Sequence, residues 1–502
     1  MTRFTLIAAF VLILAGCSVG PRYRPPVTQA PSVYKQSPAQ FKESETDVWK
    51  VAEPSDAMLR GNWWEIFNDP ELNALEEQLN IDNQNIKQFF QNFMAARAIV
   101  REARAQLFPT ATASPAYRRS GSSANLGSSF SFSTGARSGL TSTLYSFPAD
   151  VSWTADLWGK IRKTVQEEQY LAQLSAADLE NERLTEQASL ATFFFEIRGQ
   201  DALQKVLNET VEADKKSLEL TRAQYDAGIT DQISVVQAQV TLESVQATAI
   251  SLGIARAQFE HAIAVLLGKP ASEFSIPVRP MTTAPPPIPI GVPSQLLERR
   301  PDIAAAERNM AAANAEIGIA KTAYFPTLNL TSTGGFESSA LKQLFEWPSR
   351  FWSIGGSLPE TIFEGGLRRA TVDQFVATYN AALAAYRQTV LTAFQQVEDG
   401  LASVRILSQQ IQQNQQAVAS AHTFLELEMG RYETGLDPYI DVVIAQTTLL
   451  NNQQSLISAQ ISQMTSAVQL ITALGGGWDR SELPTPSEVT KKPTKAEVTI
   501  QQ

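Results

Sequence analysis

The side chains that most often carry out catalysis are scarce in this sequence. Its 502 residues include two histidines, His261 and His422, and a single cysteine, Cys17. Both histidines lie in helical patterns, so we interpret them as structural. The sequence therefore offers almost no histidines for a Ser-His-Asp triad or a histidine-based metal site. No nucleotide loop or redox motif is present either. The sequence predicts neither an enzyme nor a bound cofactor or metal.

Cys17 is the residue for which the flanking sequence predicts covalent chemistry. A basic residue, Arg3, precedes an apolar run from Phe4 to Leu14, and the small residues Ala and Gly stand directly before the cysteine. The run is too short for an ordinary spanning helix, and this order is typical of a bacterial lipoprotein signal. We expect residues 1–16 to be removed and diacylglycerol and palmitoyl chains on Cys17 to hold the N-terminus at a membrane. Ser18, rather than Asp, follows the cysteine, which is similar to outer-membrane-destined lipoproteins.

Composition narrows the remaining classes. The formal net charge of −10 makes nucleic acid an unsuitable partner. No apolar run of about 20 residues follows the signal, so the sequence offers no membrane-spanning helix. Residues 17–60 are rich in proline and lack a periodic pattern, which predicts an extended tether between the lipid and the folded body.

Two stretches of the sequence repeat one pattern at a constant offset of 207 residues. The first runs from Tyr225 to Gly268 and the second from Tyr432 to Gly475. Each begins with Tyr-x-x-Gly, continues through a Val-Val pair and an Ala-Gln pair, and ends in Leu-Gly. A constant offset over so long a stretch predicts two copies of one structural unit.

Two seams of mostly apolar residues run along the first copy, with steps that alternate between three and four residues. This repeat of about 3.5 residues is typical of coiled-coil helices. A helix with two seams packs between two neighbours, which favours a stave in a closed wall; a plain antiparallel bundle is the alternative. The first seam comprises Val236, Val240, Glu243, Ala247, Ile250, Ile254, Ala257, His261 and Ala264, and the second comprises Leu242, Val245, Ala249, Leu252, Arg256, Phe259, Ile263 and Leu266.

Two segments, residues 109–157 and 327–363, are predicted to form β-hairpins. Both follow a Phe-Pro-Thr helix stop, are rich in Ser, Thr and Gly, and have aromatic residues near the strand ends. Such alternation fits transmembrane β-strands, although two soluble surface hairpins remain an alternative. Four strands per chain cannot close a barrel, and open edges are not tolerated in lipid. Two chains would give 8 strands and a filled interior, whereas three would give 12 and leave a lumen.

The segments between these features read as helices. Asp69 is a plausible N-cap for a first helix that runs to about residue 107. Long proline-free helices are expected over residues 160–226 and 367–433, each about 100 Å long. Gly228 and Gly435 suit the position after each helix end, where a turn leads into a return helix.

These elements divide the chain into two repeats. The first repeat covers residues 61–269 and the second 294–477, joined by a Pro-rich linker at 270–293. We expect residues 478–502 to be a disordered tail.

The sequence as a whole resembles the TolC-like outer membrane factor family, and its lipidated OprM-like (NodT) branch in particular. The resemblance rests on Leu-Ala-Gly-Cys17, the segment Trp63-Trp64-x-x-Phe-x-Asp-Pro-x-Leu72, Leu297-Glu-Arg-Arg-Pro-Asp-Ile303 and the two turns. It covers essentially the whole mature chain.

The resemblance implies a mainly α-helical fold with a transmembrane β-barrel. Three chains would form a 12-stranded barrel in the outer membrane of a Gram-negative bacterium. The barrel would continue into a 12-helix periplasmic tunnel. Such a homotrimer serves as the passive exit duct of a tripartite efflux pump for drugs or other small toxic compounds. Its expected partners are a periplasmic adaptor, an inner-membrane transporter of the RND type and outer membrane lipid.

In this family the turns of the return helices close the periplasmic end of the tunnel, where an acidic ring faces the lumen. The resemblance assigns the acid six residues after the turn glycine to Asp441. The family's second acid is replaced by Ile444, so a two-ring constriction is not implied, and Ser234 takes the place of Asp441 in the first copy. Other charged residues near the turns are candidates for gate links or adaptor contacts, or are simply solvated: Asp226, Asp231, Glu433, Asp437, Arg222 and Arg431.

Three other functions remain open at this point. A duct for type I protein secretion or for metal-ion efflux would have the same architecture. A coiled-coil lipoprotein that tethers envelope layers would be purely structural, and the two predicted hairpins argue against it.

Overall fold

The computed structural model describes the repeats, part of the linker between them and part of the N-terminal tether. Cys17 lies outside the described residues, as does most of the predicted tether over residues 17–60. The described residues are 19–26, 31, 34–36, 61–121, 141–281, 284–288 and 296–493.

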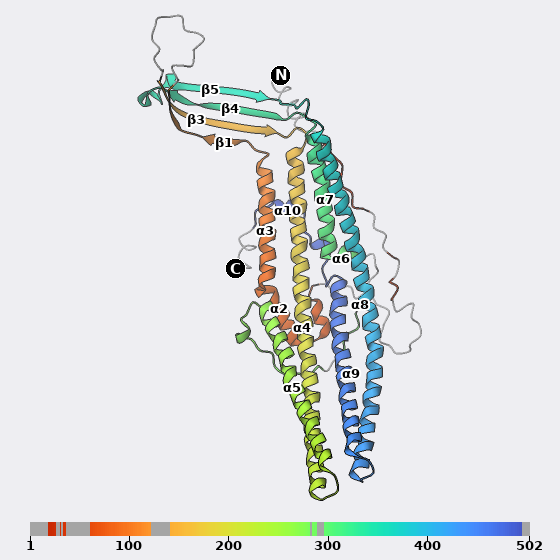
Figure 1. The fold of residues 1–502 in the computed structure, drawn as a ribbon. Coiled ribbons are helices and arrows are strands. Elements are labelled where there is room, and N and C mark those ends of the chain that lie inside the picture. The colour runs from red at the N-terminus through yellow and green to blue at the C-terminus, as the bar shows by residue number, and fades with distance from the viewer. Residues whose placement is uncertain are drawn as a thin grey trace, which may run out of the picture.

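The molecule is a long helical body with a β-sheet at one end and two helical hairpins at the other (Figure 1). The first repeat contains α2 (Pro70–Asp82), α3 (Gln84–Ala105), the strands β1 to β3, α4 (Lys160–Asp226) and α5 (Gln232–Leu266). The second contains α6 (Leu296–Arg299), α7 (Pro301–Thr322), β4, β5, α8 (Leu367–Glu433) and α9 (Tyr439–Ala473). The predicted order of helix, hairpin, long helix and return helix is confirmed in both copies.

The long helices begin and end where the sequence predicts. Both α4 and α8 start after a glycine in the left-handed region, Gly159 with φ 82° and Gly366 with φ 91°. Each then runs for 67 residues without a break. Asp69 is the N-cap of α2, where its carboxylate accepts from the backbone N–H groups of Glu71 and Leu72.

The prediction of one unbroken first helix is wrong, because Asn83 divides it into α2 and α3. The Asn83 side chain accepts from the Ile86 backbone N–H at 3.0 Å and so caps α3. Its amide also donates to the Leu266 carbonyl at 2.9 Å and to Glu186 at 3.3 Å. These last two bonds join segments distant in the sequence, so local periodicity carries no sign of the break.

The sheet is antiparallel and open at both edges within the described residues. Its strands are β1 (Thr110–Ala113), β2 (Ala116–Gly121), β3 (Thr141–Ala155), β4 (Leu328–Ser338) and β5 (Arg350–Ser357). Both β1 and β2 pair with β3, as one strand interrupted at Ser114 and Pro115, and β4 lies between β3 and β5. Proline lacks a backbone N–H, which explains an interruption at an edge strand.

Among the described residues, no helix is long and apolar enough to cross a membrane.

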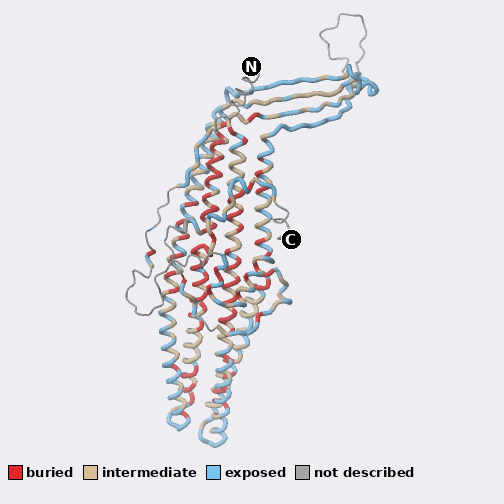
Figure 2. Tube along the Cα trace, turned by 180° about the vertical axis from the view of Figure 1, so that it is seen from behind, coloured by how far each residue is buried: buried red, intermediate tan, exposed pale blue. Residues whose placement is uncertain are grey.

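The main hydrophobic core lies in the middle of the helical body, where Figure 2 shows buried residues on several adjacent helices. Trp63 and Trp64 of the 3-10 helix η2 (Trp63–Phe67) are 0 % and 2 % exposed. They share one cluster with Phe194 of α4 and Leu470 of α9. The Trp63 indole donates to Gln187 of α4 at 3.1 Å. This core ties the N-terminal end of the first repeat to the return helix of the second.

The prediction of a disordered tail is wrong for residues 478–493. They form the 3-10 helix η7 (Arg480–Glu482) and α10 (Pro486–Thr490), which packs against α3 and α4. Val489 is fully buried with Val100 and Ala172. A capping box between Thr485 and Glu488 starts α10. The Pro- and Lys-rich composition of this segment indicates disorder, but contacts with α3 and α4 stabilise a short helix there.

Candidate functional site: the tips of the helical hairpins

The two turns at the far end of the body have the same backbone geometry. Gly228 and Gly435 lie in the left-handed region with φ 71° and 73°. The N–H of the residue after each glycine bonds back to the last turn of the long helix, Ile229 to the Gln224 carbonyl at 2.8 Å and Leu436 to Arg431 at 2.9 Å. This is the Schellman end that favours glycine. The prediction for both turn glycines is confirmed.

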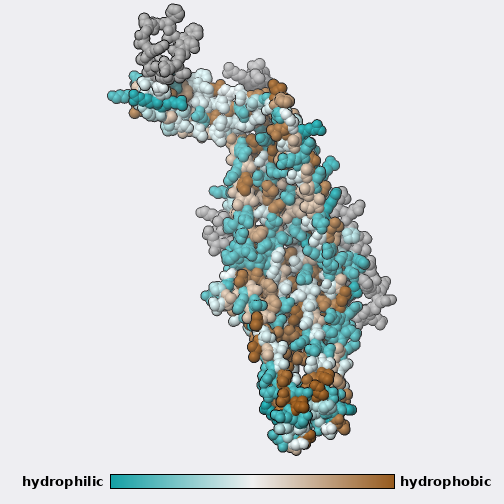
Figure 3. Space-filling view, in the orientation of Figure 1, coloured by the Kyte–Doolittle hydropathy of each residue, from teal (hydrophilic) through white to brown (hydrophobic). Residues whose placement is uncertain are grey.

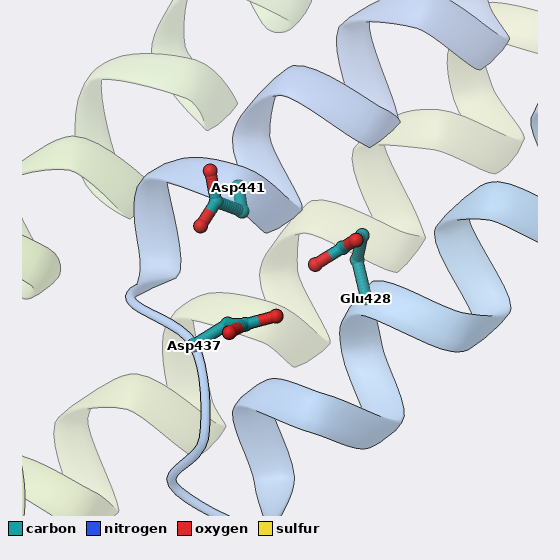
Figure 4. A group of neighbouring side chains, drawn as sticks. All are labelled: Glu428, Asp437 and Asp441. Carbon is teal, nitrogen blue, oxygen red and sulfur yellow. The ribbon is translucent and has the colours of Figure 1, made fainter.

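Three carboxylates gather at the second turn. Glu428 of α8, Asp437 of the turn and Asp441 of α9 have carboxylate oxygens within 4.8 Å of one another, and all three are half-buried. Figure 4 shows the side chains directed towards one common space between the two helices. Arg431 binds Asp437 through two nitrogens, one of them at 2.9 Å, and ties the turn to the end of α8.

The charges of this acidic group act on one another. Burial first, and then the neighbouring Asp437, raises the pKa of Glu428. The hydrogen bond from Arg431 lowers the pKa of Asp437 and raises that of Arg431 itself. One arginine thus faces three acids, which leaves the group negative at neutral pH. Asp441, Asp437 and Arg431 are among the residues that the sequence predicts for this site, whereas Glu428 is not, although it lies one helical turn before Arg431.

The first turn is less acidic. Asp231 caps α5 by accepting from the Ser234 backbone N–H at 3.0 Å and from its hydroxyl at 2.9 Å. Arg222 donates to Gln239 of α5 at 2.7 Å. The Arg222–Gln239 bond joins α4 to α5, whereas Asp231 and Ser234 form the local cap of α5, so three of the predicted residues act within one hairpin in this structure. The others are exposed to solvent: Asp226, Glu433 and, 51 % exposed, Ile444.

Above the turns, a seam of buried side chains joins the α4–α5 hairpin to the α8–α9 hairpin. Tyr432 and Tyr439 are 5 % and 2 % exposed and meet edge to face. The Tyr432 hydroxyl lies 3.3 Å from Thr221, and Gln446 donates to Ser217 at 3.1 Å. Thr221 and Ser217 are on α4, so these bonds cross from one hairpin to the other. The sequence does not predict this seam, because the repeat pattern marks the position of Tyr432 but not its contact with a distant helix.

In the second copy, α9 packs between two neighbours, α8 and α4. For α5, on which the two seams are predicted, α4 is the main neighbour within one chain, so the second neighbour stays a prediction. On α5 the second seam is buried at Leu242 and Val245, each 8 % exposed, whereas much of the first seam faces solvent and only its last residue, Ala264, is buried. Part of that exposed seam lines a groove of about 460 Å³ between Ile233 of α5 and Val443 of α9. Figure 3 shows apolar surface gathered near the hairpin tips. The exposed residues of the α5 seam are Val236 at 53 %, Val240 at 56 %, Ile250 at 79 % and Ile254 at 63 %.

Comparisons with known proteins agree with this architecture. The family described as outer membrane efflux protein matches the chain twice, over residues 75–269 and 292–476. Two proteins of Pseudomonas putida, the antibiotic efflux pump outer membrane protein ArpC and the toluene efflux pump outer membrane protein TtgC, are each 32 % identical over 484 residues. Each alignment covers 95 % of this chain and 96 % of the relative. The solved structure of the outer-membrane channel OprN superposes with a TM-score of 0.82 at 27 % identity, covering 92 % of this chain and 100 % of the other.

The two matched regions coincide closely with the two structural repeats, and the fold is that of a TolC-like outer membrane channel. The chain therefore belongs to the outer membrane efflux protein family.

Proposed function

We propose that three copies of this chain form the outer membrane exit duct of a tripartite efflux pump. The observation that carries the proposal is the pair of unpaired edges on the described sheet, formed by β1 and β2 on one side and β5 on the other. An open edge in lipid leaves backbone groups without hydrogen-bond partners, which costs several kcal/mol per group. Joining β5 of one chain to the first strand of the next removes every edge.

Three copies are favoured over two by the width of the resulting barrel. The sheet offers four strand positions across, so three chains would supply twelve strands. A barrel of about eight strands is filled by side chains, whereas a wider one leaves a lumen. The exposed α5 seam supplies the matching contact below the membrane, because a second copy would cover Ile250 and Ile254.

The duct is passive in this account. The chain forms the path through which the cargo passes, and a partner supplies the driving energy. We expect a periplasmic adaptor and an inner-membrane transporter of the RND type as partners. The cargo class is small toxic compounds, in line with the antibiotics and toluene in the relatives' names. The chain itself performs no chemical reaction on them.

The gate of the duct lies at the hairpin tips. Asp441, with Glu428 and Asp437, would form one acidic ring when three copies meet around the axis. Ile444 stands one helical turn further along α9 and would place an apolar ring beside it. Ser234 would contribute a neutral position from the first turn. Carboxylates that face one another in a narrow lumen repel one another and attract cations.

The anchor is a lipidated Cys17. Diacylglycerol and palmitoyl chains there would fix each N-terminus in the outer membrane beside the barrel, supplying the two chains that stable anchoring requires. Radioactive palmitate should label the full chain and should not label Cys17→Ser. Equal labelling of both proteins would contradict the assignment.

A growth assay tests the exported class. Deleting the gene in its native host should increase sensitivity to toluene and to antibiotics, and the wild-type gene should restore resistance. If the duct exports a different class of compound, the deletion would leave the sensitivities to toluene and to antibiotics unchanged. A deletion that increases sensitivity to metal salts alone, with resistance restored by the wild-type gene, would replace the cargo assignment with metal ions.

A further inference from the structure

A carboxylate without a partner lies in the seam between the two hairpins. Asp214 of α4 is 2 % exposed, and neither of its oxygens has a hydrogen-bond partner among the described residues. Burying a charged carboxylate without a partner is costly, so such a position is rare unless the group becomes neutral.

The position of Asp214 places it on the face of α4 that meets the other hairpin. Asp214, Ser217 and Thr221 follow one another at helical spacing on that face, and all three are buried. Ser217 and Thr221 contact Gln446 and Tyr432 across the seam. Asp214 thus occupies the third position of a stripe whose other two members hold the hairpins together.

The hydrogen-bond donors of the seam are directed to groups other than Asp214: the Gln446 amide donates to Ser217, and the Tyr432 hydroxyl donates to Thr221. The buried oxygen of the Gln446 side chain also has no partner. The ionisable groups facing the seam are Tyr439 of α9 and Tyr432 of α8, whereas α5 contributes the apolar Ala238 and Leu242. No cation faces Asp214 in the part of the chain that the structure describes, so ionisation leaves its charge uncompensated. A proton on Asp214 removes that charge and adds one donor to the seam.

Electrostatics point the same way. Burial alone raises the pKa of Asp214 from 3.8 to about 6. Burial and the nearby Asp214 together raise the pKa of Tyr439 to about 12, which keeps that phenol neutral. Burial is the cause of the raised pKa of Asp214, and the acidic group at the turn makes no contribution to it. Asp214 therefore titrates separately from the acidic group.

We propose that Asp214 is a proton-operated latch that sets how firmly the α4–α5 hairpin holds the α8–α9 hairpin. The neutral form lets the hairpins stay packed, and the ionised form favours their separation. This inference rests on the proposed duct, since parting the hairpins widens the gate at their tips. It adds a control point in the seam, at a residue that is not part of the acidic group.

The direction of the pH effect follows from linkage. Packing favours the protonated form, so the packed state is most stable below the pKa of the solvated group and loses stability as pH rises through about 6. Within that window the ratio of separated to packed hairpins rises by up to about tenfold per pH unit for each chain. Above the window the effect levels off.

A distance measurement on the full-length protein tests the latch without relying on conduction. Spin labels at Ala227→Cys and Thr434→Cys, exposed residues at the two turns, report how far apart the hairpins lie. Between about pH 4.5 and pH 7.5 the population with a long distance should grow in the otherwise unaltered chain. Asp214→Asn, which is neutral at every pH, should keep the short distance throughout. Glu219→Gln, an exposed acid on the same helix, should behave like the unaltered chain.

The outcomes separate the latch from the duct. An Asp214→Asn chain with the same pH-dependent distance as the Glu219→Gln control would overturn the latch and leave the duct intact. A distance that responds as expected, in a protein that passes no current at any pH, would support the latch and refute the duct. Current and distance that change together, and only when Asp214 can ionise, would support both.

Discussion

The exposed seam of α5 gives the sharpest prediction about assembly. Ile250 and Ile254 are 79 % and 63 % exposed in the single chain, so folding of the chain uses little of their apolar surface. If a second copy covers them, replacing both with Asn should weaken the trimer and leave the fold of each chain unchanged.

The magnitude follows from the exposed area. Full burial of one isoleucine stabilises by about 1.5–3 kcal/mol. The exposed fractions of Ile250 and Ile254 together amount to roughly 1.4 isoleucines, so about 2–4 kcal/mol per chain is available to the interface. Three chains would lose about 6–12 kcal/mol, an upper figure because neighbouring side chains can shift to fill the space.

The assay is the temperature at which the purified trimer separates into monomers on a semi-native gel. The matched control replaces Ile81 and Val265, which are 67 % and 70 % exposed and belong to neither seam, with Asn. The seam variant should dissociate at a clearly lower temperature than the control, with equal helix content by circular dichroism. Equal dissociation temperatures would refute the assignment of this seam to the interface between chains.

Two further predictions follow from the core and from the acidic group. Trp63→Ala removes a fully buried indole that donates a hydrogen bond to Gln187, and it should destabilise the chain by about 3–5 kcal/mol. The measurement is the thermal midpoint of the helical circular dichroism signal, which should fall. An unchanged midpoint would show that this core contributes little to stability. The acidic group at the second turn should make the duct prefer cations, measured as the reversal potential in a salt gradient, and Asp441→Asn should reduce that preference; a preference for anions in the unaltered chain would contradict the proposed ring.

Sequence periodicity predicted the long elements because their physics is local. The bounds of α4 and α8 follow from proline-free helical stretches that begin after Gly159 and Gly366. The turns follow from a glycine in the left-handed region, which few other residues adopt. The N-cap at Asp69 likewise depends on its immediate neighbours.

The features that the sequence did not predict depend on contacts between distant segments. Asn83 breaks the first helix through bonds to α4 and α5, and Val489 orders the tail by packing on α3 and α4. Glu428 joins the acidic group only once α8 and α9 lie side by side. Asp214 is a charged residue at a position where the helical periodicity predicts a buried side chain. That its carboxylate lacks a hydrogen-bond partner can be seen only in the folded chain.

Single-channel current through the purified protein in a planar bilayer tests the central claim most directly. The unaltered chain should give small and rare openings, and Asp441→Ala should give larger or more frequent ones, because the substitution places a smaller side chain at the proposed constriction in all three chains. Glu426→Ala, which removes an exposed acid on the same hairpin outside the acidic group, should match the unaltered chain. A large current that neither substitution changes would keep the duct and move the gate elsewhere. No current from any of the three, with insertion verified, would contradict the account of this protein as an exit duct.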